Sequence, residues 1–221
     1  IRYGAFETTF SITVSPASAA AIVTDESEIM TALGNPSITD ITISGDFTIA
    51  GTVTLDRNIA IRGDLKVTSL TVNEGVTLTM ADGRIVSDGN LEIKGTGKII
   101  ATAYVATNVD NRVDHAAIYA GGKLTIDGAD VDCCNIATGN SGDIEIKGGA
   151  VVNVYGKNAI AGTDVVNGIH ASGATITVSG TGTELNILYN AGDYAGNPAN
   201  TSPATPAAIE AAEVIVDGAR F

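Results

Sequence analysis

The sequence predicts an all-β chain that folds as a right-handed parallel β-helix, a solenoid whose short strands stack in successive coils around one core. Three observations support this prediction. Between Ile41 and Val67 an apolar-x-apolar triplet returns every six residues; glycine, aspartate and asparagine lie between the triplets; and a longer unit repeats in the second half of the chain. Alternation inside a triplet is the two-residue period of a strand with one buried face. Three such hexads make roughly one turn of a triangular solenoid.

The hexads indicate both the hand and the number of sides of this solenoid. Left-handed solenoids favour one large apolar residue in each hexad, whereas two alternate here, which favours the right-handed form. Three triplets in each coil predict three sheets, with roughly eight coils in total. The triplets begin at Ile41, Phe47, Val53, Ile59 and Leu65.

The second half of the chain repeats a unit of strand, glycine turn, strand, glycine turn and third apolar stretch. Residues 84–95 align without a gap with residues 117–128 at an offset of 33, so that Leu91 matches Leu124. Because one coil needs only about 18 residues, the surplus is expected to leave the solenoid as loops. Three segments carry this surplus: Ala101 to His115, Tyr155 to Asn167, and Tyr189 to Ala207.

The chain before the first hexad is predicted to form two further parts. Residues 1–15 alternate apolar and polar positions, which predicts a strand or a hairpin. Residues 16–40 contain a small-residue linker and a helix signal, in which Asp25 and Glu28 are expected as N-cap and capping partner. A helix at that place covers the open end of the β-helix, which we expect to occupy residues 41–221.

Composition and cysteine spacing exclude some partners and constrain others. The chain has 12 lysines and arginines against 25 aspartates and glutamates, and the resulting net charge of −13 repels nucleic acid. No apolar run reaches the ~18 residues of a membrane span, so membrane insertion is not expected. Cys133 and Cys134 are predicted to be free thiols, one facing the core and one a turn, because adjacent residues are poorly placed for a relaxed disulfide. A vicinal disulfide and metal ligation are the alternatives.

Several stretches resemble known families. The segment TDESEIMTAL at residues 24–33, followed by ITDITISGDFTI at residues 38–49, resembles the opening of pectate-lyase-like right-handed β-helix domains of bacterial surface proteins. The later stretches GIHASG and ITVSG are similar to the glycine-rich coils of those domains. Residues 1–15 resemble the last strands of a bacterial immunoglobulin-like module. These resemblances imply an extracellular or bacterial cell-surface location, within a longer protein that has further domains.

The loop at residues 101–115 contains the candidate catalytic chemistry. Within six residues it holds Asp110, Asn111, Arg112, Asp114 and His115. Paired carboxylates there can act as acid and base on a glycosidic bond, with Asp110, Asp114 and His115 as the catalytic candidates. They can also bind a calcium ion, and the metal-ligand candidates are then Asp110, Asp114, Asp130 and Asp132. No other cofactor is expected.

The outward positions on the first strand of each coil contain no acidic array, which disfavours catalysis. These positions are Val86, Tyr119, Ala137, His170 and Glu210. Ligand contact is predicted instead, because tyrosine rings can stack on sugars, at Tyr104, Asp110, Asn111, Arg112, Tyr119 and His170. We therefore expect a non-catalytic extracellular surface module that is adhesive, contacts a polysaccharide or a host or cell-surface glycan, or acts as a spacer. A polysaccharide lyase or glycoside hydrolase is the alternative.

Overall fold

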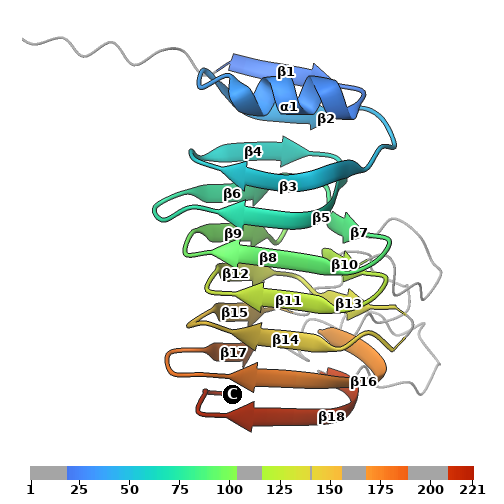
Figure 1. Ribbon diagram of the computed structural model, residues 1–221, viewed down its shortest axis with the longest axis vertical. Helices are drawn as coiled ribbons and strands as arrows, with labels where there is room; N and C mark the ends of the chain where they lie inside the picture. Colours follow the sequence, from blue (N-terminus) through green and yellow to red (C-terminus); the bar gives the residue numbers. More distant parts are fainter. Residues whose placement is uncertain (1–18, 104–115, 140, 156–167, 189–208) are drawn as a thin grey trace, which may run out of the picture.

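The chain folds into an all-β parallel solenoid that is closed at one end by a short helix. The computed structural model describes residues 19–103, 116–139, 141–155, 168–188 and 209–221. Every strand pairing among these residues is parallel. In Figure 1 the nearer strands run to the left and the farther strands to the right while the chain descends, which is a right-handed path. The predicted fold class is confirmed.

Two sheets run the length of the solenoid. The first is eight-stranded and contains, in spatial order, β1 (Ala19–Val23), β2 (Ile38–Ile43), β4 (Ile59–Arg62), β6 (Thr77–Met80), β9 (Lys98–Ala101), β12 (Asp130–Cys133), β15 (Val151–Val154) and β17 (Glu184–Ile187). The second is ten-stranded and contains β3 (Ile49–Leu55), β5 (Leu65–Val72), β7 (Ile85–Ser87), β8 (Leu91–Gly95), β10 (Ile118–Ala120), β11 (Leu124–Asp127), β13 (Ile136–Thr138), β14 (Ile144–Lys147), β16 (Ile169–Ser179) and β18 (Ile209–Asp217).

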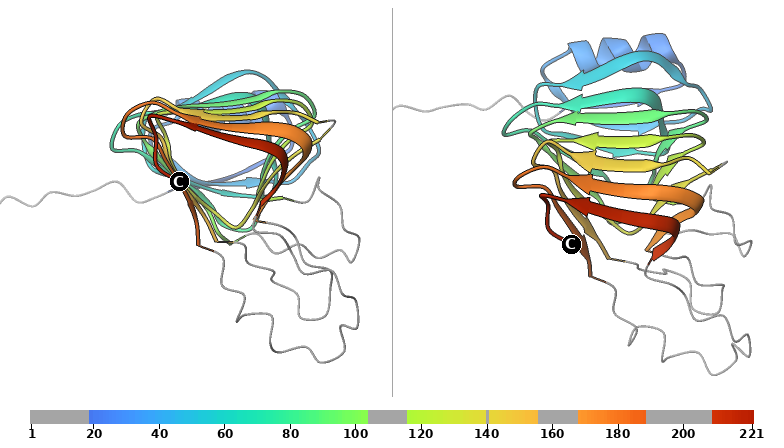
Figure 2. Two further views of the ribbon diagram at one scale, coloured as in Figure 1. Left: turned by 90° about the horizontal axis from the view of Figure 1, so that it is seen from below. Right: turned by 60° about the horizontal axis from the view of Figure 1, so that its bottom comes forward.

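The expected three sheets are joined into two, because some strands continue round one corner of the coil. Seen along the axis, the coils superpose as one outline (Figure 2). Strand β5 pairs with β7 through its first residues and with β8 through its last ones. In β16 the bend falls at Gly173, which has a φ of +75°. Glycine adopts that left-handed conformation without steric cost, so the strand turns the corner without ending.

The predicted register between coils is confirmed in the second half of the chain. Ile118 pairs with Ile85 at the offset of 33, and Leu124 pairs with Leu91. The first coils depart from a strict eighteen-residue repeat, since Val53 pairs with Leu70 and Ile41 pairs with Ile61. The two residues of the first pair are slightly fewer than eighteen positions apart in the sequence, and those of the second pair are slightly more than eighteen apart.

The inward positions form one continuous apolar core along the axis. The predicted core residues are at most 2% exposed, namely Ile59, Leu91, Leu124, Ile144 and Ile176. Close stacking of the coils leaves no room for a side chain at some turns. A β-carbon added to Gly83 would lie 1.7 Å from the backbone oxygen of Gly63 in the preceding coil. Glycine is therefore required at that turn by space alone.

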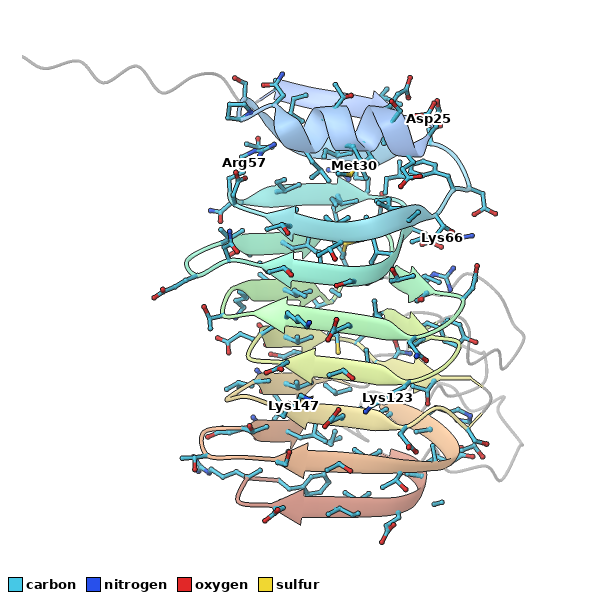
Figure 3. The ribbon with its side chains drawn as sticks, in the orientation of Figure 1. Asp25, Met30, Arg57, Lys66, Lys123 and Lys147 are labelled. Atoms are coloured by element: carbon cyan, nitrogen blue, oxygen red, sulfur yellow. The ribbon has the colours of Figure 1, made fainter. Side chains whose placement is uncertain are left out.

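The helix α1 (Glu26–Gly34) lies across the first coils, as the sequence predicted. Asp25 is its N-cap, and the Asp25 carboxylate accepts a hydrogen bond of 2.9 Å from the amide of Glu28. The Glu28 carboxylate reaches back to the amide of Thr24 at 2.7 Å, one residue before the expected partner. Ile29, a residue of the helix itself, is fully buried. Figure 3 shows Asp25 and Arg57 at opposite ends of α1.

Arg57 closes the other end of the helix. Its guanidinium donates hydrogen bonds to the carbonyl oxygens of Ala32, Asn35 and Ile38, at 3.2, 2.8 and 3.1 Å. The last carbonyls of a helix have no partner within the helix, and a cationic donor also favours the negative end of the helix dipole. None of the helices in the described part of the chain is long and apolar enough to cross a membrane. The strand expected at residues 1–15 lies outside the described residues.

Candidate functional site

All three predicted insertions leave the solenoid at one corner. This corner separates the eight-stranded sheet from the first strand of the next coil. The insertions lie between β9 and β10, between β15 and β16, and between β17 and β18. Strands β9, β12, β15 and β17 are paired in register, and so are β10, β13, β16 and β18. The flanks of the insertions therefore stack on one another, and we call this place the insertion corner.

Between the first and second insertions, the chain passes the insertion corner with only two residues, Cys134 and Asn135, between β12 and β13. The Cys134 thiol donates to the carbonyl oxygen of Thr102 at 3.1 Å. The Asn135 Oδ1 accepts a hydrogen bond of 2.7 Å from the amide of Ala117. Because Thr102 lies at the start of the first insertion and Ala117 follows its end, this tight turn holds both ends of that insertion.

The two cysteines are free thiols, as the sequence predicted. Cys133 lies on β12 and faces the core, whereas Cys134 lies in the turn at the insertion corner, and both are buried. Burial raises the pKa of the Cys133 thiol well above its ordinary value. A thiolate is the reactive form of cysteine, so Cys133 is not suited to nucleophilic chemistry.

On one side of the insertion corner lies the predicted column of outward residues. Registers confirm its order: Val86, Tyr119, Ala137, His170 and Glu210. His170 Nδ1 lies 3.0 Å from the Glu210 carboxylate on the next coil. Tyr119 is two coils away from His170, about 10 Å at the usual strand spacing. The Tyr119 hydroxyl lies over Gly139, where an added β-carbon would be 2.6 Å from it.

On the other side of the insertion corner, a row of hydrogen-bonded polar side chains runs across neighbouring strands of the eight-stranded sheet. Asn153 Nδ2 donates to Asp132 Oδ1 at 2.8 Å, and Asn186 Nδ2 donates to Asn153 Oδ1 at 3.0 Å. Lys98 Nζ lies 2.7 Å from Asp132 Oδ2. These residues stand on successive coils, on β9, β12, β15 and β17. We call this row of Lys98, Asp132, Asn153 and Asn186 the polar ladder.

The polar ladder sets the charge state of its carboxylate. Desolvation, the largest single effect, raises the pKa of Asp132, but the hydrogen bonds from Lys98 and Asn153 together outweigh it, so the pKa lies below the ordinary value. The hydrogen bond to Asp132 likewise raises the pKa of the Lys98 ammonium. Asp132 is therefore an ionised acceptor at neutral pH.

The outer face of the ten-stranded sheet carries paired charges. Glu145 on β14 lies 2.8 Å from Lys123 Nζ and 3.2 Å from Lys147 Nζ. Figure 3 shows both lysines on the face toward the viewer. The hydrogen bond from Lys123, then that from Lys147, lowers the pKa of Glu145. This carboxylate is also held ionised.

Of the predicted metal-ligand carboxylates, the structure describes Asp130 and Asp132, and a further carboxylate, Asp143, lies elsewhere on the coil. Asp130 and Asp132 lie on β12 of the eight-stranded sheet. Asp143 precedes β14 in the other sheet, and its carboxylate accepts from the amide of Thr175 at 2.9 Å. Among the residues that the structure describes, no group of three or more histidine, cysteine, aspartate or glutamate side chains is arranged to hold a metal ion.

Most of the predicted site lies outside the described residues. This applies to Tyr104, Asp110, Asn111, Arg112, Asp114 and His115. Of the predicted contact residues, Tyr119 and His170 are described, and both stand beside the insertion corner. The polar ladder and the partner of His170 were not predicted from the sequence. Glu210 follows His170 in the outward column, so that alignment contained the signal for the pair.

Comparisons with protein-family models, with curated proteins and with solved structures find no match. The parallel solenoid is consistent with a β-helix domain. The resemblance to pectate-lyase-like domains stays a prediction.

Proposed function

We propose that this chain is a non-catalytic extracellular surface module that contacts a polysaccharide or a cell-surface glycan at the insertion corner. The observation that carries the proposal is that three surplus segments leave a regular scaffold at the same corner, from three of four successive coils whose flanking strands stack in register. Inserted segments on a rigid repeat scaffold are where solenoids usually bind their ligands.

The chemistry beside the insertion corner supports contact with sugar hydroxyl groups. A sugar hydroxyl both donates and accepts hydrogen bonds, and an asparagine amide offers two donor hydrogens and an acceptor oxygen. The polar ladder uses one donor of Asn153 and one of Asn186 internally. The remaining amide capacity faces outward at the spacing of the strands. Tyr119 adds a ring on which a sugar can stack.

The charge states support binding over catalysis. A glycosidase needs one carboxyl group that stays protonated near neutral pH, and such a group has a raised pKa. Asp132, beside the insertion corner, has a lowered pKa, and so does Glu145 on the outer face of the ten-stranded sheet. These two groups fit structural ion pairing and hydrogen-bond acceptance.

The alternative is a polysaccharide lyase or glycoside hydrolase that uses Asp110, Asp114 and His115. One observation favours it. His170 is held by Glu210 at 3.0 Å on the same corner, and an imidazole oriented by a carboxylate is the arrangement of a positioned general base.

A panel of uronate polymers, neutral polysaccharides and cell-surface glycans, scored for binding and for product release, separates the two functions. We expect binding without new reducing ends or unsaturated uronates. The Tyr119→Ala and Asn186→Ala variants should weaken binding, whereas Thr125→Ala, an outward change on β11 away from the insertion corner, should not. Cleavage that Asp110→Ala abolishes would establish the enzyme instead. A panel with neither binding nor cleavage would reject glycan contact and leave a spacer.

The extracellular or cell-surface location is part of the same proposal. It is supported by the net charge of −13 and by the sequence resemblance. Antibody labelling of intact source cells tests it, with permeabilised cells as the control. Labelling that requires permeabilisation would reject the location.

A further inference from the structure

The middle of the polar ladder has hydrogen-bonding capacity that the fold does not use. Asn153 donates one amide hydrogen to Asp132 and accepts one hydrogen bond from Asn186 at its Oδ1. An asparagine amide has two donor hydrogens and an oxygen with two lone pairs. Within the described part of the chain, one donor hydrogen and one lone pair of Asn153 therefore have no protein partner. The side chain is partly exposed, so a ligand can reach both.

Apolar side chains border this amide on both sides along its strand. Val151 and Tyr155 lie two residues before and two residues after Asn153, so they share its outward face. The backbone stays paired as far as Tyr155, whose amide donates to the carbonyl oxygen of Cys133 at 3.0 Å. Val151 and Tyr155 are both partly exposed. Since β15 is paired with β12 on one side and with β17 on the other, this surface lies inside the sheet and away from its edges.

The charges around Asn153 do not suit an anionic sugar. The cation of the polar ladder, Lys98, is paired with Asp132 at 2.7 Å. Asp130, which is exposed, stands in register beside Val151 on the neighbouring strand. The whole chain has a net charge of −13. A uronate carboxylate at this place would meet like charge, whereas a neutral sugar would not.

An acetamido group matches this surface better than the other groups that sugars carry. Its carbonyl oxygen accepts a hydrogen bond, its N–H donates one, and it has no charge. Its methyl group needs an apolar neighbour, and Val151 and Tyr155 provide one. A hydroxyl group can also use the free donor and acceptor of Asn153, but it has no apolar part to place against the flanking side chains. Amide groups are also known to align in rows at the spacing of β-strands.

We propose that the polar ladder binds a 2-acetamido sugar, with the acetamido group over Asn153 and its methyl group against Val151 and Tyr155. This inference rests on the proposed glycan contact at the insertion corner, and it names the class of sugar. Because Tyr155 is the first residue of the second insertion, the contact lies directly beside that corner. Polymers of 2-acetamido sugars and single residues of this kind in a cell-surface glycan share the chemistry.

Three tetrasaccharides that differ in one kind of group test the class of sugar. Chitotetraose carries acetamido groups where cellotetraose carries hydroxyl groups, and tetragalacturonate carries carboxylates. Isothermal titration calorimetry measures the binding of each to the full chain. Chitotetraose should bind at least about tenfold more tightly than cellotetraose, because the acetamido group adds a matched amide contact and a covered methyl group. Tetragalacturonate should bind most weakly of the three.

Variants of the chain test the place of binding. Asn153→Ala should reduce the preference for chitotetraose over cellotetraose to about twofold or less, and Val151→Ser should reduce it in part. Asn90→Ala removes an asparagine amide just before β8 of the other sheet and is the matched control, expected to keep the full preference. The ratio of the two affinities is the readout, because partial unfolding would weaken both sugars alike. Circular dichroism confirms that each variant is folded.

Several results would overturn the inference. These are equal affinity for chitotetraose and cellotetraose, tighter binding of tetragalacturonate, and a preference that Asn153→Ala leaves intact. Competition by free N-acetylglucosamine or N-acetylgalactosamine would support it and identify the sugar, and competition by neither would overturn it. If none of the three tetrasaccharides binds at millimolar concentration while another glycan does, the sugar class is wrong and glycan contact stands. If no glycan binds, the proposed function fails as well.

Discussion

Replacing Asn135 with alanine tests whether the turn at Cys134 and Asn135 holds the base of the insertion corner. Asn135 is 5% exposed, and its hydrogen-bond donor, the amide of Ala117, belongs to a fully buried residue. The truncated side chain leaves this amide without its acceptor and without access to water. A buried donor left unpaired costs about 1–3 kcal/mol, so we expect the free energy of unfolding to fall by that amount.

Asn90 provides the matched control. Its Oδ1 accepts from the amide of Lys123 on the next coil at 2.9 Å, the same kind of bond, but in an exposed position. Water replaces the lost acceptor there, so Asn90→Ala should cost less than about 0.5 kcal/mol. Urea unfolding followed by circular dichroism measures both losses, and equal m-values show that the same structure unfolds.

Hydrogen exchange locates the effect of Asn135→Ala. If the loss acts through local opening at the base of the insertion, exchange at Ala117 should accelerate about 5- to 150-fold. Exchange at the amides of β8 and β11 should accelerate by no more than the global loss of stability requires. Equal destabilisation by Asn90→Ala and Asn135→Ala would refute the reasoning, because burial would then not decide the cost.

Three further predictions follow from the core and the polar ladder. The pKa of Asp132 is lowered on folding, so the stability from its ion pair is complete above the unfolded pKa of about 3.9 and is lost as the pH falls through the folded pKa. Asp132→Asn should therefore be less stable than the parent at neutral pH and equally stable at the acid end of a urea titration; a constant difference would contradict this. A thiol reagent should modify neither Cys133 nor Cys134 in the native chain and both in urea, whereas a vicinal disulfide would leave both unmodified throughout. Gly83→Ala should cost about 1–3 kcal/mol and lower the Tm, because its β-carbon meets a backbone oxygen at 1.7 Å. Gly51→Ala, with nothing within 4 Å, is the control, and an equal fall in Tm would refute the steric argument.

The fold and most of the register were predictable from the sequence, because alternation and glycine turns act locally. Leu91 and Leu124 align in the sequence for the same reason that they pair in space: each fills the same inward place in its coil. The joining of three sides into two sheets was not predicted. It depends on whether a strand bends or ends at a corner, and Gly173 permits both.

The candidate site was less predictable, because its contacts cross coils whose lengths differ. The ladder contact from Asp132 to Asn153 spans a sequence separation of 21, whereas the contact from Asn153 to Asn186 spans 33. An asparagine on a strand has no periodic signature of its own, so nothing local marks it as part of a ladder. The bond from Ala117 to Asn135 spans a separation of 18, which is one coil, but nothing local distinguishes Asn135 from any other asparagine in a turn.

The two-residue passage at Cys134 and Asn135 shows how widely the length of the segment at the insertion corner can vary. The passages between β9 and β10, between β15 and β16 and between β17 and β18 are several times longer, yet the strands on both sides of the insertion corner keep their pairing. Each doubling of a flexible loop costs only about 0.6 kcal/mol of closure entropy. Segment length at this corner is therefore nearly independent of the stacked framework. A foreign peptide grafted between Cys134 and Asn135 should be carried without loss of the fold, which makes the corner a natural place for new specificities to evolve or to be engineered.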